Sequence, residues 1–257
     1  MTAMNSNQTG NLCPSEDLLL AYLQRRASAE DRGSIEAHID RCDACRLREE
    51  AYHAAADEPP APDFHEGHVI AGRYRVVGLL DEGGFATAYH AVDVRTNQRV
   101  VLKCQRRERA ADFPIEVEHK FLDSLRHRGI VKSLDLVVHD GRQVLVTQFV
   151  DGKPLRDLIP RVGGRLDCAL GLIRGIADPL AHVHAANKRH CDLTPSNIIV
   201  DSVSQQPVLI DFGIAAHADS GRLLRAGAPG YMSPERRSGG GFDARADVWS
   251  LGVIFYE

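Results

Sequence analysis

The sequence lacks any apolar run approaching the roughly 18 residues that a membrane-crossing helix needs. Its amino-terminal segment also lacks the apolar core of a secretory signal peptide. The formal net charge is only -4, yet residues 1–66 hold 6 Lys/Arg against 13 Asp/Glu. These features argue against a membrane span in the residues present and against a nucleic-acid-binding arm at the amino terminus. They favour a cytoplasmic protein, although a membrane tether beyond Glu257 stays open.

Aromatic residues make up 6% of the chain, and its six cysteines are too few for a disulfide-rich scaffold. What is present is an ordinary globular composition of 257 residues, 44% hydrophobic and 26% charged. A chain of this length can bury more than one core. We therefore expect one large domain and a small module, with cysteines that serve as metal ligands, buried thiols or site residues.

Residues 11–55 predict a small helical module. Serine is a preferred helix N-cap, and Ser15 and Ser28 stand where two helices are expected to begin. In the second of these helices, His38 and Cys42 are four residues apart and are expected on one face. Residues 56–66 are rich in proline and predict a linker.

Four side chains of the module have the chemistry of a closed zinc site, which takes thiolates and imidazoles in a tetrahedron: Cys13, His38, Cys42 and Cys45. The alternative is that the cysteines are small buried hydrophobes and the histidine is solvated. Because so small a core needs a staple to fold alone, Zn²⁺ is favoured. The stretch resembles the anti-sigma-factor type zinc-finger domain of bacteria. The resemblance implies binding of a regulatory protein, sensing of thiol oxidation or a purely structural role, and these stay open.

Two motifs near the middle of the chain carry a general base and oxygen ligands. Asp192 and Asn197 lie in His190-Cys191-Asp192-Leu193-Thr194-Pro195-Ser196-Asn197, and Asp211-Phe212-Gly213 follows fourteen residues later. Expected strands at 198–200 and 208–210 bring Asn197 and Asp211 to one edge. Asp192 can accept the proton of an attacking alcohol, while the other two offer the hard oxygen ligands that Mg²⁺ prefers. The alternative is a buried hairpin with polar residues placed by chance.

These motifs resemble the catalytic and metal loops of the protein kinases, and further elements follow the order of that family. Lys103 ends an apolar strand at 100–103, and the resemblance makes Glu118 its partner, with Glu116 as the competing choice. A glycine-containing turn at 81–86 resembles the phosphate-binding loop. The resemblance also implies nucleotide contacts from residues of the loop, the gatekeeper position and the hinge: Leu80, Gly83, Gly84, Phe85, Ala88, Lys103, Thr147, Gln148, Val150, Asn197 and Asp211.

The resemblance implies an α+β, two-lobed protein-kinase-like fold over residues 67–257, incomplete at the carboxyl end. The β-rich N-lobe is expected at 67–150 and the helical C-lobe at 151–257. The implied activity is that of a bacterial, eukaryotic-like, non-specific serine/threonine protein kinase. It would use ATP with Mg²⁺ or Mn²⁺ and act on proteins bearing Ser or Thr, with no nucleic-acid partner.

The chain departs from the family pattern at five positions: Asp81, Ala86, Cys191, Thr194 and Ala228. Thr194 replaces the usual catalytic-loop lysine, so slow turnover is expected. The departures motivate an alternative, a nucleotide-binding pseudokinase that signals by its shape. Between Asp211 and Glu235 the hydroxyls are only Ser220, Tyr231 and Ser233, and Cys191 stands where the family usually has arginine. We therefore expect no switching by phosphorylation of this segment.

Overall fold

The computed structural model describes residues 5–6, 12–23, 27–42, 44–46, 64–83, 86–105, 114–162, 166–215, 227–238 and 241–257. The chain divides into two compact units, Met1–Ala61 and Pro62–Glu257. Across these described ranges, no helix is both long enough and apolar enough to cross a membrane.

The smaller unit is built on two helices, α1 (Glu16–Leu23) and α2 (Ala29–Ile39), preceded by the short paired strands β1 (Asn5–Ser6) and β2 (Leu12–Cys13). Both expected serine caps form. Ser15 Oγ accepts from the Leu18 amide at 3.3 Å, and Ser28 Oγ accepts from the Asp31 amide at 3.1 Å. In the described part of this unit, the buried core is small and consists of Leu19, Ile35, Ile39 and Cys45.

The expectation that His38 and Cys42 share one helix is wrong, because α2 ends at Ile39. After that residue the backbone hydrogen bonds join residues three apart, as in a 3₁₀ turn. The Arg41 amide donates to the His38 carbonyl at 3.0 Å, and the Cys42 amide donates to the Ile39 carbonyl at 3.3 Å. The turn carries Cys42 off the helix, while its side chain still lies beside His38.

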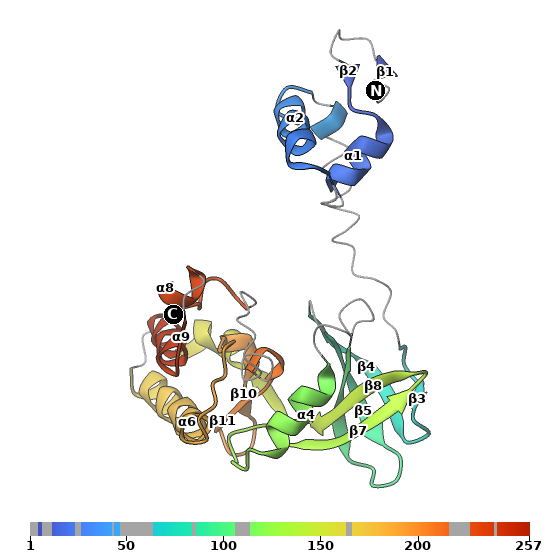
Figure 1. The fold of residues 1–257 in the computed structure, drawn as a ribbon. Helices are drawn as coiled ribbons and strands as arrows, with labels where there is room; N and C mark the ends of the chain where they lie inside the picture. Colours follow the sequence, from blue (N-terminus) through green and yellow to red (C-terminus); the bar gives the residue numbers. More distant parts are fainter. Residues whose placement is uncertain are drawn as a thin grey trace. The chain divides into compact units, whose positions relative to one another are not determined.

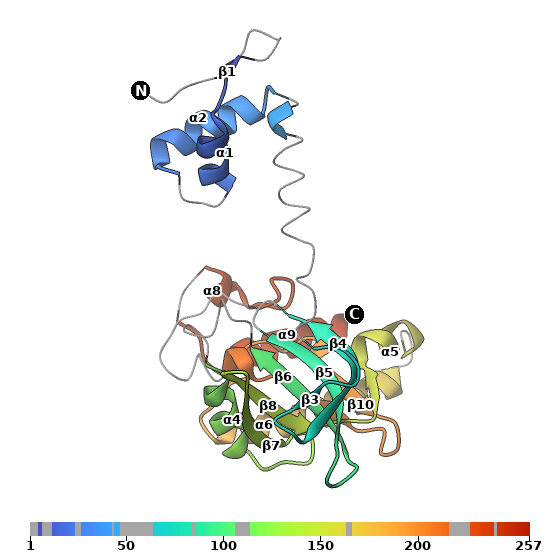
Figure 2. The same ribbon diagram turned by 90° about the vertical axis from the view of Figure 1, so that its right-hand side faces the viewer.

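The larger unit begins with a six-stranded antiparallel sheet in the order β3-β4-β5-β6-β8-β7, which faces the viewer in Figure 2. Its strands are β3 (Val69–Ile70), β4 (Tyr74–Glu82), β5 (Ala86–Asp93), β6 (Arg99–Gln105), β7 (Ser133–His139) and β8 (Arg142–Gln148). Helix α4 (Ile115–Asp123) lies at the edge formed by β7 and β8. Phe64, within the range expected as a linker, is buried and packs on Tyr89.

Strand β4 is longer than the sequence pattern indicated. The turn was expected to start at Asp81, but Asp81 pairs with Ala88 and Glu82 with Thr87 in the β4–β5 ladder. Two register shifts along β4 place these polar residues in the strand, and a period-2 pattern does not reveal such shifts.

The rest of this unit is mostly helical (Figure 1). Its helices are α5 (Leu155–Val162), α6 (Leu166–Ala185), the 3₁₀ turn η2 (Pro195–Asn197), α8 (Pro234–Arg237) and α9 (Arg245–Tyr256). A small sheet in the order β11-β10-β9 joins β9 (Gly152–Pro154), β10 (Ile198–Asp201) and β11 (Pro207–Leu209). Gly152 allows the close approach of β9 to β10, since a Cβ there would lie 2.1 Å from the Val200 carbonyl oxygen.

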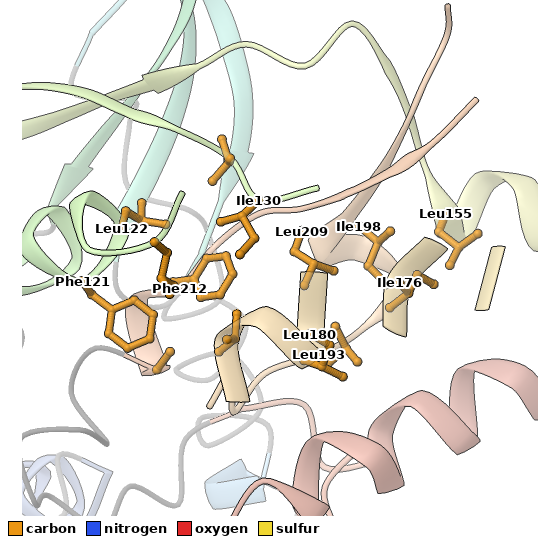
Figure 3. Packing of buried hydrophobic residues seen from close by; sticks show 14 of the residues in the cluster. Phe121, Leu122, Ile130, Leu155, Ile176, Leu180, Leu193, Ile198, Leu209 and Phe212 are labelled. Carbon is orange, nitrogen blue, oxygen red and sulfur yellow. The ribbon is translucent and has the colours of Figure 1, made fainter. Parts of the chain in front are cut away.

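One hydrophobic cluster links α4 to the helical part (Figure 3). Phe212 is fully buried beside Phe121, with ring centroids 5.7 Å apart, and the cluster continues through Leu209 and Ile198 to Ile176 of α6. Asp211, which precedes Phe212, and Asn197, which precedes Ile198, are thereby fixed against a common support. The core thus positions the two motifs that the sequence singled out.

Candidate active site and metal centre

Lys103 of β6 is the cation around which the first part of the site is built. Its Nζ lies 2.8 Å from both carboxylate oxygens of Glu118 on α4 and 2.5 Å from Asp211 Oδ1. The Phe212 amide also donates to Glu118 Oε1, at 3.2 Å. Glu116, the competing residue, forms an exposed pair with Lys120 instead. The arrangement ties β6, α4 and the Asp211 loop together.

The ionisation of these groups follows from their surroundings. Burial acts to lower the pKa of Lys103, but Asp211 and Glu118 outweigh it and raise that pKa above its usual value. Burial raises the pKa of Glu118 despite the ammonium beside it. Burial also acts to raise the pKa of Asp211, but the charge of Lys103 and hydrogen bonds from Lys103 and the Gly213 amide bring that pKa below its usual range. The site therefore holds a charged lysine and a charged Asp211.

Asp192 and Asn197 form the second part of the site. Asn197 Nδ2 donates to the Asp192 backbone oxygen at 2.8 Å and to Asp192 Oδ2 at 3.2 Å. The other carboxylate oxygen, Oδ1, accepts from the Ala228 amide at 3.1 Å. Both oxygens of Asp192 are thus oriented by the chain, from η2 on one side and the 227–228 segment on the other.

The loop that carries Asp192 is braced from below by Asp247 of α9. Asp247 is buried and accepts from the amides of His190 and Cys191, each at 2.8 Å, and from His184 Nε2 at 2.8 Å. Burial opposes the charge of Asp247, but these donors hold its pKa below the usual range. Cys191 needs the brace, since its φ of 66° lies in the left-handed region that non-glycine residues rarely adopt.

The described residues among the expected nucleotide contacts line two adjoining hollows between the sheet and the helical part. A pocket of about 290 Å³ is lined by Leu80, Ala88, Lys103, Thr147, Gln148, Val150, Asn197 and Asp211, among others. An adjoining hollow of about 440 Å³ is lined by Gly83, Lys103, Asp192, Thr194, Asn197 and Asp211, among others. Gly84 and Phe85 lie outside the described residues. The size and mixed lining suit a nucleotide.

In the smaller unit, the four predicted zinc ligands come together. The ligand atoms of Cys13, His38, Cys42 and Cys45 all lie within 4.8 Å of one another. The Sγ atoms of Cys13 and Cys42 are 3.8 Å apart, and a tetrahedral ion with Zn–S bonds of about 2.3 Å would place them at about that separation. His38 Nε2 is buried and has no hydrogen-bond partner among the residues that the structure describes, as suits a ligand atom. Burial raises the pKa of Cys45 to about 12, so its thiolate needs a cation beside it.

Sequence reasoning missed one contact and one residue of the site. Ala228 was singled out for its side chain, whereas it is the backbone amide of Ala228 that donates to Asp192. Arg236 is buried below the catalytic loop, although it follows Glu235 in a charged run that reads as solvent-exposed. The sequence offered one indication of its burial, namely its position two residues after Pro234 in the segment that follows Ala228.

Two family models match the chain. Residues 74–257 match the protein kinase domain, and residues 15–46 match a zinc-finger family. Both confirm the family resemblances drawn from the motifs. The zinc-finger match covers α1, α2 and three of the four residues of the Cys/His cluster.

Several curated relatives are similar to this chain. The DNA damage-responsive serine/threonine-protein kinase RqkA of Deinococcus radiodurans is 35% identical over 207 residues, which are 74% of this chain and 30% of that protein. Serine/threonine-protein kinase PrkC of Bacillus subtilis is 30% identical over 200 residues, 74% of this chain and 31% of that protein. Serine/threonine-protein kinase PknA of Mycobacterium tuberculosis is 32% identical over 205 residues, which are 74% of this chain and 47% of that protein. The chain thus spans less than half the length of these relatives.

Among solved structures, a double mutant of the PknI kinase domain from Mycobacterium tuberculosis is similar, with a TM-score of 0.61 and 24% identity. The likeness covers 76% of this chain and 75% of that one. Together with the domain match, it confirms the expected α+β, two-lobed fold.

Proposed function

Because this chain belongs to the protein kinase family, we propose that it is a serine/threonine protein kinase that transfers the γ-phosphoryl group of ATP to a protein hydroxyl. The observation that carries the proposal is the convergence of Lys103, Asp192, Asn197 and Asp211 on adjoining hollows. The names of the relatives support a Ser/Thr acceptor. Since the chain spans only part of those proteins, its activity and substrates rest on this proposal.

Each residue has a role that follows from its contacts. Lys103, held by Glu118, donates to nucleotide phosphates in the hollow that it lines. Asp192 accepts the proton of the acceptor hydroxyl as the new O–P bond forms and the bond to the leaving ADP oxygen breaks. The Ala228 amide and Asn197 hold the Asp192 carboxylate so that it faces this reaction. Thr147, Gln148 and Val150 line the part of the pocket proposed for the adenine ring.

The donor set fits a hard divalent cation. Asn197 and Asp211 offer an amide and a carboxylate oxygen to the same hollow, and Asp211 is charged beside Lys103. We assign Mg²⁺ or Mn²⁺ to these two residues, with ATP as the nucleotide. The bound ion would neutralise charge on the transferring phosphoryl group.

A second candidate, a pseudokinase that binds nucleotide without transfer, is favoured by the charge of the site. Among the described residues that line the 440 Å³ hollow, Lys103 is the sole cation, against the carboxylates of Asp81, Glu118, Asp192 and Asp211. Thr194 lines this hollow at the position where the family usually has lysine. The chain thus has little positive charge to offer a transferring phosphoryl group.

The test measures transfer of label from Mg-ATP to a generic Ser/Thr protein by the wild type and by Thr194→Lys, with Thr194→Met as the uncharged control of similar length. We expect measurable transfer by the wild type, and a kcat raised on the order of tenfold or more by the lysine alone. Label found as phosphoserine or phosphothreonine supports the acceptor class. A wild type and a lysine variant that both bind Mg-ATP yet transfer nothing would favour the pseudokinase.

A further inference from the structure

Arg236 is a buried cation that the proposed mechanism does not use. It lies in the short helix α8, and its side chain is 5% exposed, whereas the next residue, Arg237, is exposed. A guanidinium group is rarely buried unless polar or aromatic groups surround it, because it loses its water. Its surroundings therefore indicate what it does.

Arg236 joins three segments beneath the catalytic loop. Its Nη1 donates to the backbone carbonyl of Cys191. Its guanidinium lies over the ring of Phe242, 5.2 Å from the centroid. Arg189 at the start of the loop lies over the same ring at 5.3 Å and donates to the Phe242 carbonyl at 2.9 Å. Arg189 and Arg236 thus connect the loop to one aromatic ring through cation–π contacts.

The Cys191 carbonyl belongs to the peptide group that precedes Asp192. Asp247 already holds the two preceding peptide groups through the His190 and Cys191 amides. Arg236 holds the next one through the carbonyl of Cys191, whose φ is 66°. A strained backbone relaxes unless its neighbours fix it, so the direction of the Asp192 side chain depends on both anchors.

The same arginine packs against the segment that returns to Asp192. Gly227 has a φ of 125°, and a Cβ there would lie 3.1 Å from Asp192 Oδ1 and 3.3 Å from Arg236 Nη2. A side chain at position 227 would therefore crowd both groups, and the Ala228 amide that follows Gly227 donates to Asp192. Moving Arg236 would displace this donor together with the loop.

We infer that Arg236 is a positioning residue that fixes the catalytic loop and residues 227–228 around Asp192 without phosphorylation of the segment between Asp211 and Glu235. The inference rests on the proposed function and adds its mode of regulation. Cys191 cannot pair with a phosphate as a guanidinium would, while Arg236 reaches the loop backbone directly. The catalytic loop is thus ordered by residues of the chain itself and needs no phosphate group.

The experiment compares Arg236→Met and Arg236→Lys with Arg237→Met, an exposed arginine from the same helix. In the full chain, Arg236→Met is expected to lower kcat on the order of 10²-fold while the KM for ATP stays within about twofold. Hydrogen exchange of the 188–193 amides is expected to accelerate about tenfold or more in parallel. Arg236→Lys keeps the charge but cannot both bond Cys191 and cover Phe242. Its kcat and its exchange rate are therefore expected between those of the wild type and those of Arg236→Met. Phosphatase treatment of the wild type is expected to leave its rate unchanged.

A folded Arg236→Met protein with wild-type kcat and wild-type exchange would overturn the inference. If Arg236→Met does not fold, an Arg236→Lys protein equal to wild type in both readouts would do the same. Loss of wild-type activity on phosphatase treatment would also overturn it. Hydrogen exchange needs no catalysis, so the inference is tested even if the wild type transfers no phosphate, a result that would count against the proposed function alone.

Discussion

Asp211→Asn is expected to lower kcat/KM for phosphoryl transfer on the order of 10³-fold. The change removes a charged oxygen ligand for the divalent cation and the carboxylate that bonds Lys103 at 2.5 Å. It does not strain the backbone, because Asn accepts the left-handed conformation that Asp211 adopts, with a φ of 58°. The loss should therefore come from chemistry and not from misfolding.

The measurement combines steady-state kinetics with calorimetric titration of ATP in the presence and absence of Mg²⁺. Mg²⁺ is expected to strengthen ATP binding to the wild type and to do little for the variant. Asp140→Asn is a matched control, since Asp140 is also left-handed, with a φ of 48°, and lies in an exposed turn. An Asp211→Asn protein with the kinetics of this control would remove Asp211 from the proposed site.

Removing zinc is expected to unfold the smaller unit and to leave the larger one folded. Among the described residues of the smaller unit, the buried core has only four, Leu19, Ile35, Ile39 and Cys45, and one of them is a proposed ligand. The burial of a few apolar side chains cannot offset the conformational entropy lost when two helices are ordered. Metal binding would therefore supply the missing free energy of folding. Cys42→Ser should have the same effect as a strong chelator.

The readouts are zinc content and limited proteolysis of the full chain. We expect about one zinc per chain, lost in Cys42→Ser and kept in Cys168→Ser, whose cysteine lies on α6 outside the cluster. Cleavage should concentrate within residues 12–46 once zinc is lost. A protease-resistant module without metal would refute a structural zinc site. Peroxide treatment that releases zinc and also changes phosphorylation would favour a redox sensor over a staple.

The sequence was most informative where a motif carried its own chemistry. The prediction that two short strands bring Asn197 and Asp211 to one edge agrees with the structure, in which β10 and β11 pair and both residues line the same hollow. The expected fold came from the family resemblance that these motifs carry. The Cys/His cluster was also found from the sequence, because its residues are rare types with the chemistry of zinc ligands.

What the sequence concealed depends on backbone geometry and tertiary packing. Helical spacing from Ile35 to Cys42 hid the end of α2, because the turn after Ile39 keeps Cys42 close to His38. The register shifts in β4 moved Asp81 into a strand. Arg236 looked like a surface residue, since nothing local predicts that a guanidinium will be buried against the carbonyl of a residue 45 positions earlier.

The proposed kinase activity is tested most directly by a single-turnover reaction of the full chain with Mg-ATP and a Ser/Thr acceptor, beside Asp192→Asn. We expect transfer by the wild type and a rate at least about 10²-fold lower in the variant, with equal ATP affinity in both, because Asp192 acts on the hydroxyl and not on the nucleotide. Equal rates in the two proteins would contradict the role of Asp192. A wild type that binds Mg-ATP and transfers nothing would contradict the kinase itself.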